Sequence, residues 1–186
     1  MPSQAANLGS LPNSMLSERE QILFKKALTY ANGYRELGMV EEALQELANL
    51  GETYASRTEF LQMQLAIFME AKRWQDALPV ANILASRNDS DPGNFVNLAY
   101  ITRRASGIEG ARIILENASK RFPREAIIHY NLGCYACCTK DMDTAKAHLL
   151  TSFSLDESYL EMSETDEDLK SLRSWIAKIP RPEKES

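Results

Sequence analysis

The chain has 186 residues, of which 44% are apolar and 25% are charged, and its formal net charge is −5. This length suits one folding unit with a sizeable core, and the acidic balance argues against a general attraction to nucleic acid. No apolar run reaches the roughly 18 residues that a membrane-spanning helix needs, so no membrane association is expected. The amino terminus has neither a basic start nor an apolar stretch, so a secretory signal is not expected.

Residues 1–16 are rich in proline, glycine and small polar residues, and this composition predicts a flexible leader. Ser17 and Glu20 match a capping box, in which each side chain bonds the other residue's backbone N–H at a helix start. The first helix is therefore expected to begin after Ser17 and to run to about Leu37. Gly38 then suits the left-handed turn that ends many helices.

Four alanines recur at intervals of 34 residues, at Ala43, Ala77, Ala111 and Ala145. An apolar side chain stands three residues before each alanine, and a small residue stands twelve before it in three of the copies. A fixed period of this length indicates a copied supersecondary unit. Because small residues let two helices approach closely, the pattern predicts a stack of helical hairpins. Their helices are expected over about 40–53, 57–71, 74–87, 92–105, 107–121, 125–139 and 142–154.

The fourth copy has the clearest local pattern, Tyr130-Asn131-Leu132-Gly133 followed by Ala145-x3-Leu149. It resembles the tetratricopeptide repeat (TPR) family, whose signature is W-x2-L-G-x2-Y, then A-x3-F, then P. The resemblance spans roughly residues 24–157 and implies an all-α fold, a right-handed α-solenoid of four helical hairpins. Within a repeat region of 17–157, the hairpins would occupy about 24–57, 58–91, 92–125 and 126–157.

The second repeat is the least regular, because Gln64 falls where the other copies place an apolar residue. Two interpretations follow. Either Leu65 and Ala66 fill the apolar and small positions after a turn shortened by one residue, or Leu61, Leu65 and Phe68 form the buried face without a shift.

Two prolines help to place helix starts. A proline in a helix interior costs about 3 kcal/mol, so we interpret Pro79 as a first-turn residue and expect its helix to begin near Gln75 or Asp76. Pro92 follows a polar loop and suits the first position of a helix.

Beyond residue 157 the period stops, but apolar residues still recur every three or four positions. Leu169, Leu172, Trp175 or Ile176, and Ile179 follow this spacing. Because a repeat stack exposes its last hairpin, we expect a C-terminal capping helix over about 166–178, within a region of 158–180, that covers the fourth repeat. Residues 181–186 are predicted to be a charged tail.

Cys134, Cys137 and Cys138 are the only cysteines and crowd one predicted helix. Structural zinc sites draw ligands from two separated pairs, and no second pair exists, so we expect no metal. The cluster is typical of reduced thiols in a cytoplasmic protein and of small packing side chains, although a redox role stays open. No phosphate-binding loop, nucleophile elbow or zinc-protease motif occurs, so neither an enzyme nor a cofactor is expected.

The TPR resemblance implies that the first helix of each hairpin lines a concave groove. Asparagine amides at these positions can bond a peptide backbone, tyrosines offer apolar area with a polar tip, and arginines favour carboxylates. We therefore expect a peptide or partner helix that carries Asp or Glu, or a free C-terminus. The candidate groove residues are Lys25, Asn32, Arg35, Asn97, Tyr100, Arg103, Arg104, Tyr130, Asn131 and Cys134.

These observations favour a cytoplasmic, non-enzymatic adaptor or scaffold that binds protein through this groove. The alternative is a chaperone or self-assembling scaffold whose groove holds a partner subunit or the chain's own terminus, and this alternative allows a homo-oligomer. A third hypothesis, a thiol-based redox or metal-responsive protein, depends only on the three cysteines.

Overall fold

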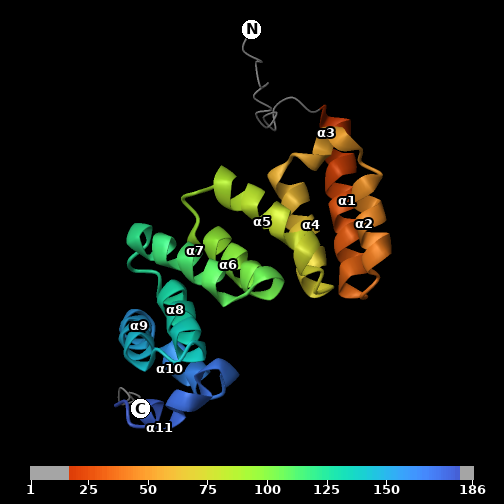
Figure 1. Cartoon of the computed structure of the whole chain (residues 1–186). Coiled ribbons are helices and arrows are strands. Elements are labelled where there is room, and N and C mark those ends of the chain that lie inside the picture. The colour runs from red at the N-terminus through yellow and green to blue at the C-terminus, as the bar shows by residue number, and fades with distance from the viewer. Residues whose placement is uncertain (1–16, 181–186) are drawn as a thin grey trace, which may run out of the picture. The chain divides into compact units, whose positions relative to one another are not determined.

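The computed structural model describes residues 17–180, which form helices joined by short turns (Figure 1). Within these residues no strand occurs, so the all-helical fold class is confirmed. The predicted leader at 1–16 and tail at 181–186 lie outside the described residues. Among the described helices, none combines the length and the apolar character that crossing a membrane requires.

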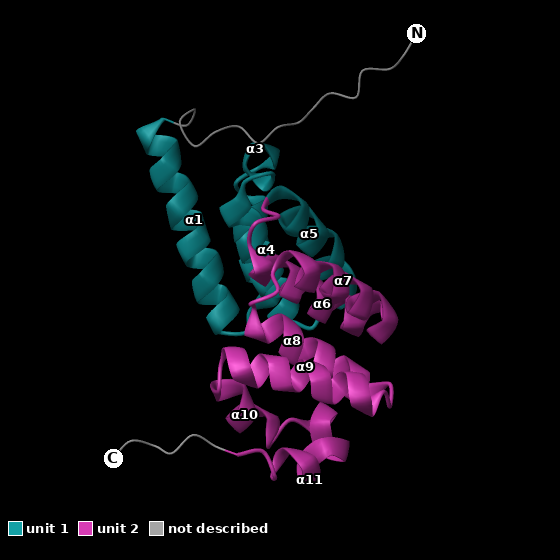
Figure 2. Ribbon diagram, turned by 90° about the vertical axis from the view of Figure 1, so that its left-hand side faces the viewer, with its two compact units in different colours: residues 1–87 teal, residues 88–186 magenta. Residues whose placement is uncertain are grey.

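The helices divide into two compact units, residues 1–87 and residues 88–186 (Figure 2). In unit 1, α1 pairs with α2 and α4 pairs with α5, which gives two helical hairpins with a short helix, α3, between them. The α1 helix begins at the predicted capping box, because Ser17 and Glu20 bond each other's backbone N–H groups. The bounds in unit 1 are α1 Glu18–Glu36, α2 Val40–Ala48, α3 Glu52–Ala55, α4 Thr58–Glu70 and α5 Trp74–Arg87.

Unit 2 contains two further hairpins, α6 with α7 and α8 with α9, and α7 also packs on α8. The chain then folds back over α8 through two short α-helices and a 3₁₀ helix, η2. The bounds are α6 Pro92–Ser106, α7 Ile108–Arg121, α8 Ala126–Cys138, α9 Met142–Leu155, α10 Ser158–Ser163, η2 Glu167–Leu172 and α11 Arg173–Ile176.

The alanine column lies where the two helices of each hairpin meet. Ala43, Ala77, Ala111 and Ala145 have no exposed surface, as the 34-residue period predicts. The crossing of α8 and α9 is especially close, because a Cβ atom added to Gly133 would lie 2.7 Å from Cγ of Leu149. A small residue is therefore required on α8 at this point, since a larger one has no room between the backbones.

Three of the first helices end in the same left-handed turn. Gly38, Lys72 and Lys140 have φ angles of 72°, 56° and 67°. After α4, the N–H of Arg73 bonds the carbonyl of Phe68 at 2.8 Å, and the N–H of Lys72 bonds that of Met69 at 3.1 Å. This is the Schellman motif, which satisfies the last carbonyls of a helix.

The position of this turn decides the register of the second repeat. Lys72 comes 34 residues after Gly38, so the turn is not shortened. Leu61, Leu65 and Phe68 are all buried, which supports the interpretation without a shift.

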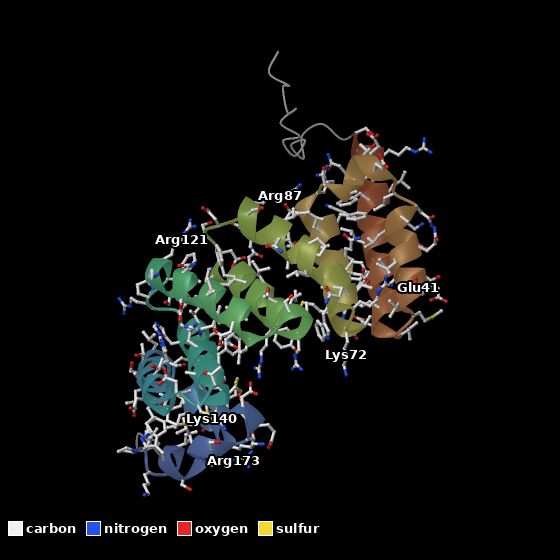
Figure 3. The ribbon with its side chains drawn as sticks, in the orientation of Figure 1. Glu41, Lys72, Arg87, Arg121, Lys140 and Arg173 are labelled. Atoms are coloured by element: carbon white, nitrogen blue, oxygen red, sulfur yellow. The ribbon has the colours of Figure 1, made fainter. Side chains whose placement is uncertain are left out.

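Lysine is an unfavourable residue in a left-handed turn, because its Cβ crowds the following carbonyl. Lys140 is exposed at the end of α8, where Figure 3 labels it together with Lys72. Replacing Lys140 by glycine should therefore raise the free energy of unfolding by about 0.5–1 kcal/mol, as measured by urea denaturation. The reverse change, Gly38→Lys, is the matched control and should lower it by a similar amount. Two shifts of the same sign would contradict the assigned turn.

Three predictions of local structure were wrong. The helix expected over 40–53 ends at Ala48, because the chain turns through Gly51 at a φ of 78° before α3. The start near Gln75 or Asp76 is also wrong, since α5 begins at Trp74 and contains Pro79 in its interior. Pro79 is exposed, so water can reach the carbonyl that a residue-79 N–H would otherwise have bonded.

The capping segment is present, but it is not the single helix expected over 166–178. It consists of α10, η2 and α11, and Asp166 rather than Thr165 caps η2 by accepting the N–H of Asp168. A 3₁₀ helix has three residues per turn, so Leu169 and Leu172 lie on one face. Both are buried together with Ile176 in the core of unit 2.

Candidate functional site

The candidate groove residues lie on α1, α6 and α8, and the face that they form is called the inner face below. In unit 1, Arg35 of α1 forms an ion pair with Glu70 of α4. The same guanidinium donates to Oδ1 of Asn32, with Nη2 at 3.0 Å, and the Asn32 amide donates to Glu36 at 2.9 Å. Lys25 is exposed and has no ion pair among the described residues. The unit 1 part of the inner face is thus a polar network that already contains two carboxylates.

In unit 2, the open part of the inner face lies on α6. Asn97 and Arg104 are exposed, and the guanidinium of Arg104 lies over the ring of Tyr100, 5.2 Å from its centroid. Within the described residues, Arg104 makes no salt bridge. Asn131 of α8 uses its amide locally, because Nδ2 donates to the carbonyl of Ile127 at 2.8 Å.

Arg103, in contrast, is fully engaged. Both of its terminal nitrogens donate to Asp168, and the Nη2–Oδ1 distance is 2.8 Å. The guanidinium also lies 5.1 Å from the centroid of the Tyr135 ring. Two parallel charge-assisted bonds make this a strong carboxylate contact. They hold the pKa of Asp168 below its usual value, while burial raises the pKa of Tyr135 to about 12.

Asp166, two residues earlier, is held by α8. The hydroxyl of Tyr130 donates to Oδ2 of Asp166 at 2.9 Å, and the thiol of Cys134 donates to the same oxygen at 3.6 Å. The ring of Tyr130 also packs on Tyr159 of α10, with 5.0 Å between the centroids. Burial, followed by the nearby Cys134 and Asp166, raises the pKa of Tyr130, so it stays a hydrogen-bond donor at neutral pH.

The structure therefore brings Arg103, Tyr130 and Cys134 together around two carboxylates of the chain's own capping segment. The sequence analysis did not select Asp166, Asp168 or Glu70. A signal for two of them exists in the period, since Asp168 comes 34 residues after Cys134 and Glu70 comes 34 after Glu36. Both acids thus continue columns of the inner face.

The three thiols show no sign of activation. Cys134 and Cys137 are buried and Cys138 is exposed. Burial raises the pKa of all three, that of Cys138 to about 11, so they are protonated at neutral pH and poor nucleophiles. Ligand atoms of Cys134, Asp166 and Asp168 lie within 4.8 Å of one another, but donors already bond these carboxylates and the Arg103 cation stands beside them. This set fits hydrogen bonding better than metal binding.

No protein-family model matches the sequence, and no curated protein matches it. Solved MamA structures do match the fold. The structure described as "MamA RS-1 ArsTM double mutant" has a TM-score of 0.63 and 18% identity, over 76% of this chain and 78% of that chain. MamA 41-end from Desulfovibrio magneticus RS-1 gives 0.63 and 18%, over 72% of this chain and 76% of that chain. MamA MSR-1 C2 gives 0.59 and 13%, over 76% of this chain and 99% of that chain. At these identities the likeness shows the fold alone: the chain has a TPR-like helical solenoid fold similar to that of MamA.

Proposed function

We propose that this protein is a non-enzymatic interaction module that binds an acidic peptide on the inner face of unit 2. The observation that carries the proposal is the grip of Arg103, Tyr130 and Cys134 on Asp166 and Asp168. Here the inner face binds two carboxylates from a short, irregular segment. The TPR-like fold supports the same function, because it displays its first helices as an extended surface.

The residues left for a partner are those on α6. Arg104 offers a planar fork with two parallel donors for a further carboxylate, and the Tyr100 ring beneath it restricts its motion. Asn97 can donate to and accept from the peptide backbone. A fitting ligand therefore carries an apolar anchor for Tyr100 next to Asp or Glu.

The test uses labelled synthetic peptides in which an apolar residue is flanked by Asp or Glu, with Lys-flanked peptides for comparison. Acidic peptides should bind with a Kd in the micromolar range, about −8 kcal/mol, and more weakly at high salt. The pair Tyr100→Ala plus Arg104→Ala should weaken binding about tenfold or more in fluorescence anisotropy.

The matched control is Lys120→Ala, an exposed cation on the second helix α7. Arg103 is left unchanged, because its loss would release Asp168 and disturb the capping segment. Equal weakening by Lys120→Ala, or equal binding of the Lys-flanked peptides, would refute the proposed face.

The second candidate function is a chaperone or self-assembling scaffold whose inner face holds a partner subunit. It is favoured by the same capping segment, which shows that a length of protein chain can lie on this face. Sedimentation equilibrium over a range of concentrations separates the two functions, because self-assembly changes the measured mass and peptide binding does not. A cytoplasmic location stays a prediction.

A further inference from the structure

The face of α1 that points away from its hairpin carries large apolar side chains in the open. Leu23, Tyr30 and Leu37 are exposed to 52%, 49% and 74% of their surface. They are spaced by seven residues, so they lie on one side of the helix, and we call them with Gly33 the outer stripe of α1. In Figure 2, α1 runs along one edge of unit 1.

The same face is covered on later first helices. Gly33 corresponds to Ile67 on α4 and Tyr135 on α8, at one and three periods, and both are buried. Ile67 packs in one cluster with Ala43 and Leu47 of the preceding second helix, α2. Tyr135 packs in another cluster with residues of the preceding second helix, α7. In this fold, the face therefore receives the second helix of the hairpin before it, and among the described residues α1 has no such neighbour.

Gly33 makes this face suitable for close helix packing. It lies inside α1, where glycine is an unfavourable helix residue, yet no atom of the described chain lies within 4 Å of an added Cβ. No contact within the structure thus requires a glycine at this position. A hollow of about 360 Å³ surrounds it, lined by Thr29, Tyr30, Gly33, Tyr34, Leu37 and Glu46. Small residues at a helix surface let a second helix approach closely.

Charge indicates which helix would fit. Arg19 and Lys26 are exposed along the stripe, and no ion pair of either occurs within the described residues. The Lys26 ammonium lies 5.4 Å from the Tyr30 ring centroid, so it borders the apolar surface. Glu46 lines the opposite side of the hollow. An occupant therefore needs acidic residues on the flank that faces Arg19 and Lys26.

We propose that the outer stripe of α1 is a docking site for one amphipathic helix of a partner protein, with an apolar seam and an acidic flank. Gly9 and Pro12 divide residues 1–16 into segments too short for such a helix, so the chain's own leader does not supply it. A second copy of the stripe would bring Arg19 and Lys26 close to like charges, which disfavours self-pairing. This site is separate from the inner face and does not depend on it.

The probe is a labelled, synthetic 18-residue helix with a leucine seam and glutamates along its flank, added to the full chain. We expect saturable binding that weakens with salt. Gly33→Gln should weaken it at least about tenfold, because the new side chain fills the hollow. The same variant should unfold at an equal or higher temperature, because glutamine is the better helix residue.

Ala48→Gln adds the same side chain at an exposed position of α2 and should leave binding unchanged. The inner-face pair Tyr100→Ala plus Arg104→Ala should also leave it unchanged, which separates this site from the proposed function. Unaltered binding by Gly33→Gln, or equal binding of a Lys-flanked helix, would overturn the proposal. So would a wild-type dimer that Gly33→Gln dissociates, or at least tenfold tighter probe binding after removal of residues 1–16, since each would identify a different occupant.

Discussion

Replacing Leu169 by alanine should lower the free energy of unfolding by about 2–5 kcal/mol. Leu169 is fully buried and belongs to the same cluster as Tyr135 and Leu172. Truncating it removes apolar contacts and leaves a cavity between η2 and α8, which the rigid crossing of α8 with α9 cannot close. Urea denaturation followed by far-ultraviolet circular dichroism measures the change.

Lys170→Ala is the matched control, because Lys170 is exposed on the same 3₁₀ helix and its loss should change the free energy by less than about 0.5 kcal/mol. The comparison decides whether the capping segment is an integral part of unit 2 or an appendage. Similar small effects from both variants would show that η2 contributes little to the stability of α8.

The hairpins could be predicted from the sequence because their determinants are local and periodic. The capping box at Ser17, the buried alanines and the turn at Gly38 each depend on residues close in the chain. Such patterns repeat with the structural unit, so each copy supports the others.

The capping segment was harder to predict because two helical periods fit its apolar residues. Leu169 and Leu172 are three apart, which suits a 3₁₀ helix, whereas Leu172 and Ile176 are four apart, which suits an α-helix. The spacing alone indicated a buried face and not the change from η2 to α11. The structure contains both, joined at Arg173.

The electrostatics of the inner face could not be derived from single columns. The sequence analysis selected more basic than acidic residues, because it left out the second repeat and the capping segment. Glu70 and Asp168 come from those two parts, and they pair with Arg35 and Arg103. Which arginine is free depends on contacts between residues far apart in the chain, and in unit 2 only Arg104 keeps its fork for a partner.

The tightest helix crossing in the described chain that carries inner-face residues gives the second large expected effect. Ala145→Leu should lower the free energy of unfolding by about 1–3 kcal/mol. Ala145 has no exposed surface, and its carbonyl oxygen lies only 3.2 Å from where a Cβ of Gly133 would be. A leucine would therefore push α9 away from α8, and no nearby flexible side chain can make room.

Ala147→Leu is the control, because Ala147 is exposed on the same helix and the two variants have equal composition. Its effect should stay within about 0.5 kcal/mol. Thermal and urea unfolding of both variants would test the 34-residue register directly, since shifting the register would move the close contact away from Ala145. If Ala145→Leu unfolded like the wild type, the crossing would tolerate a large residue, and the alanine column could not be what positions α8 and, through it, Tyr130 and Cys134.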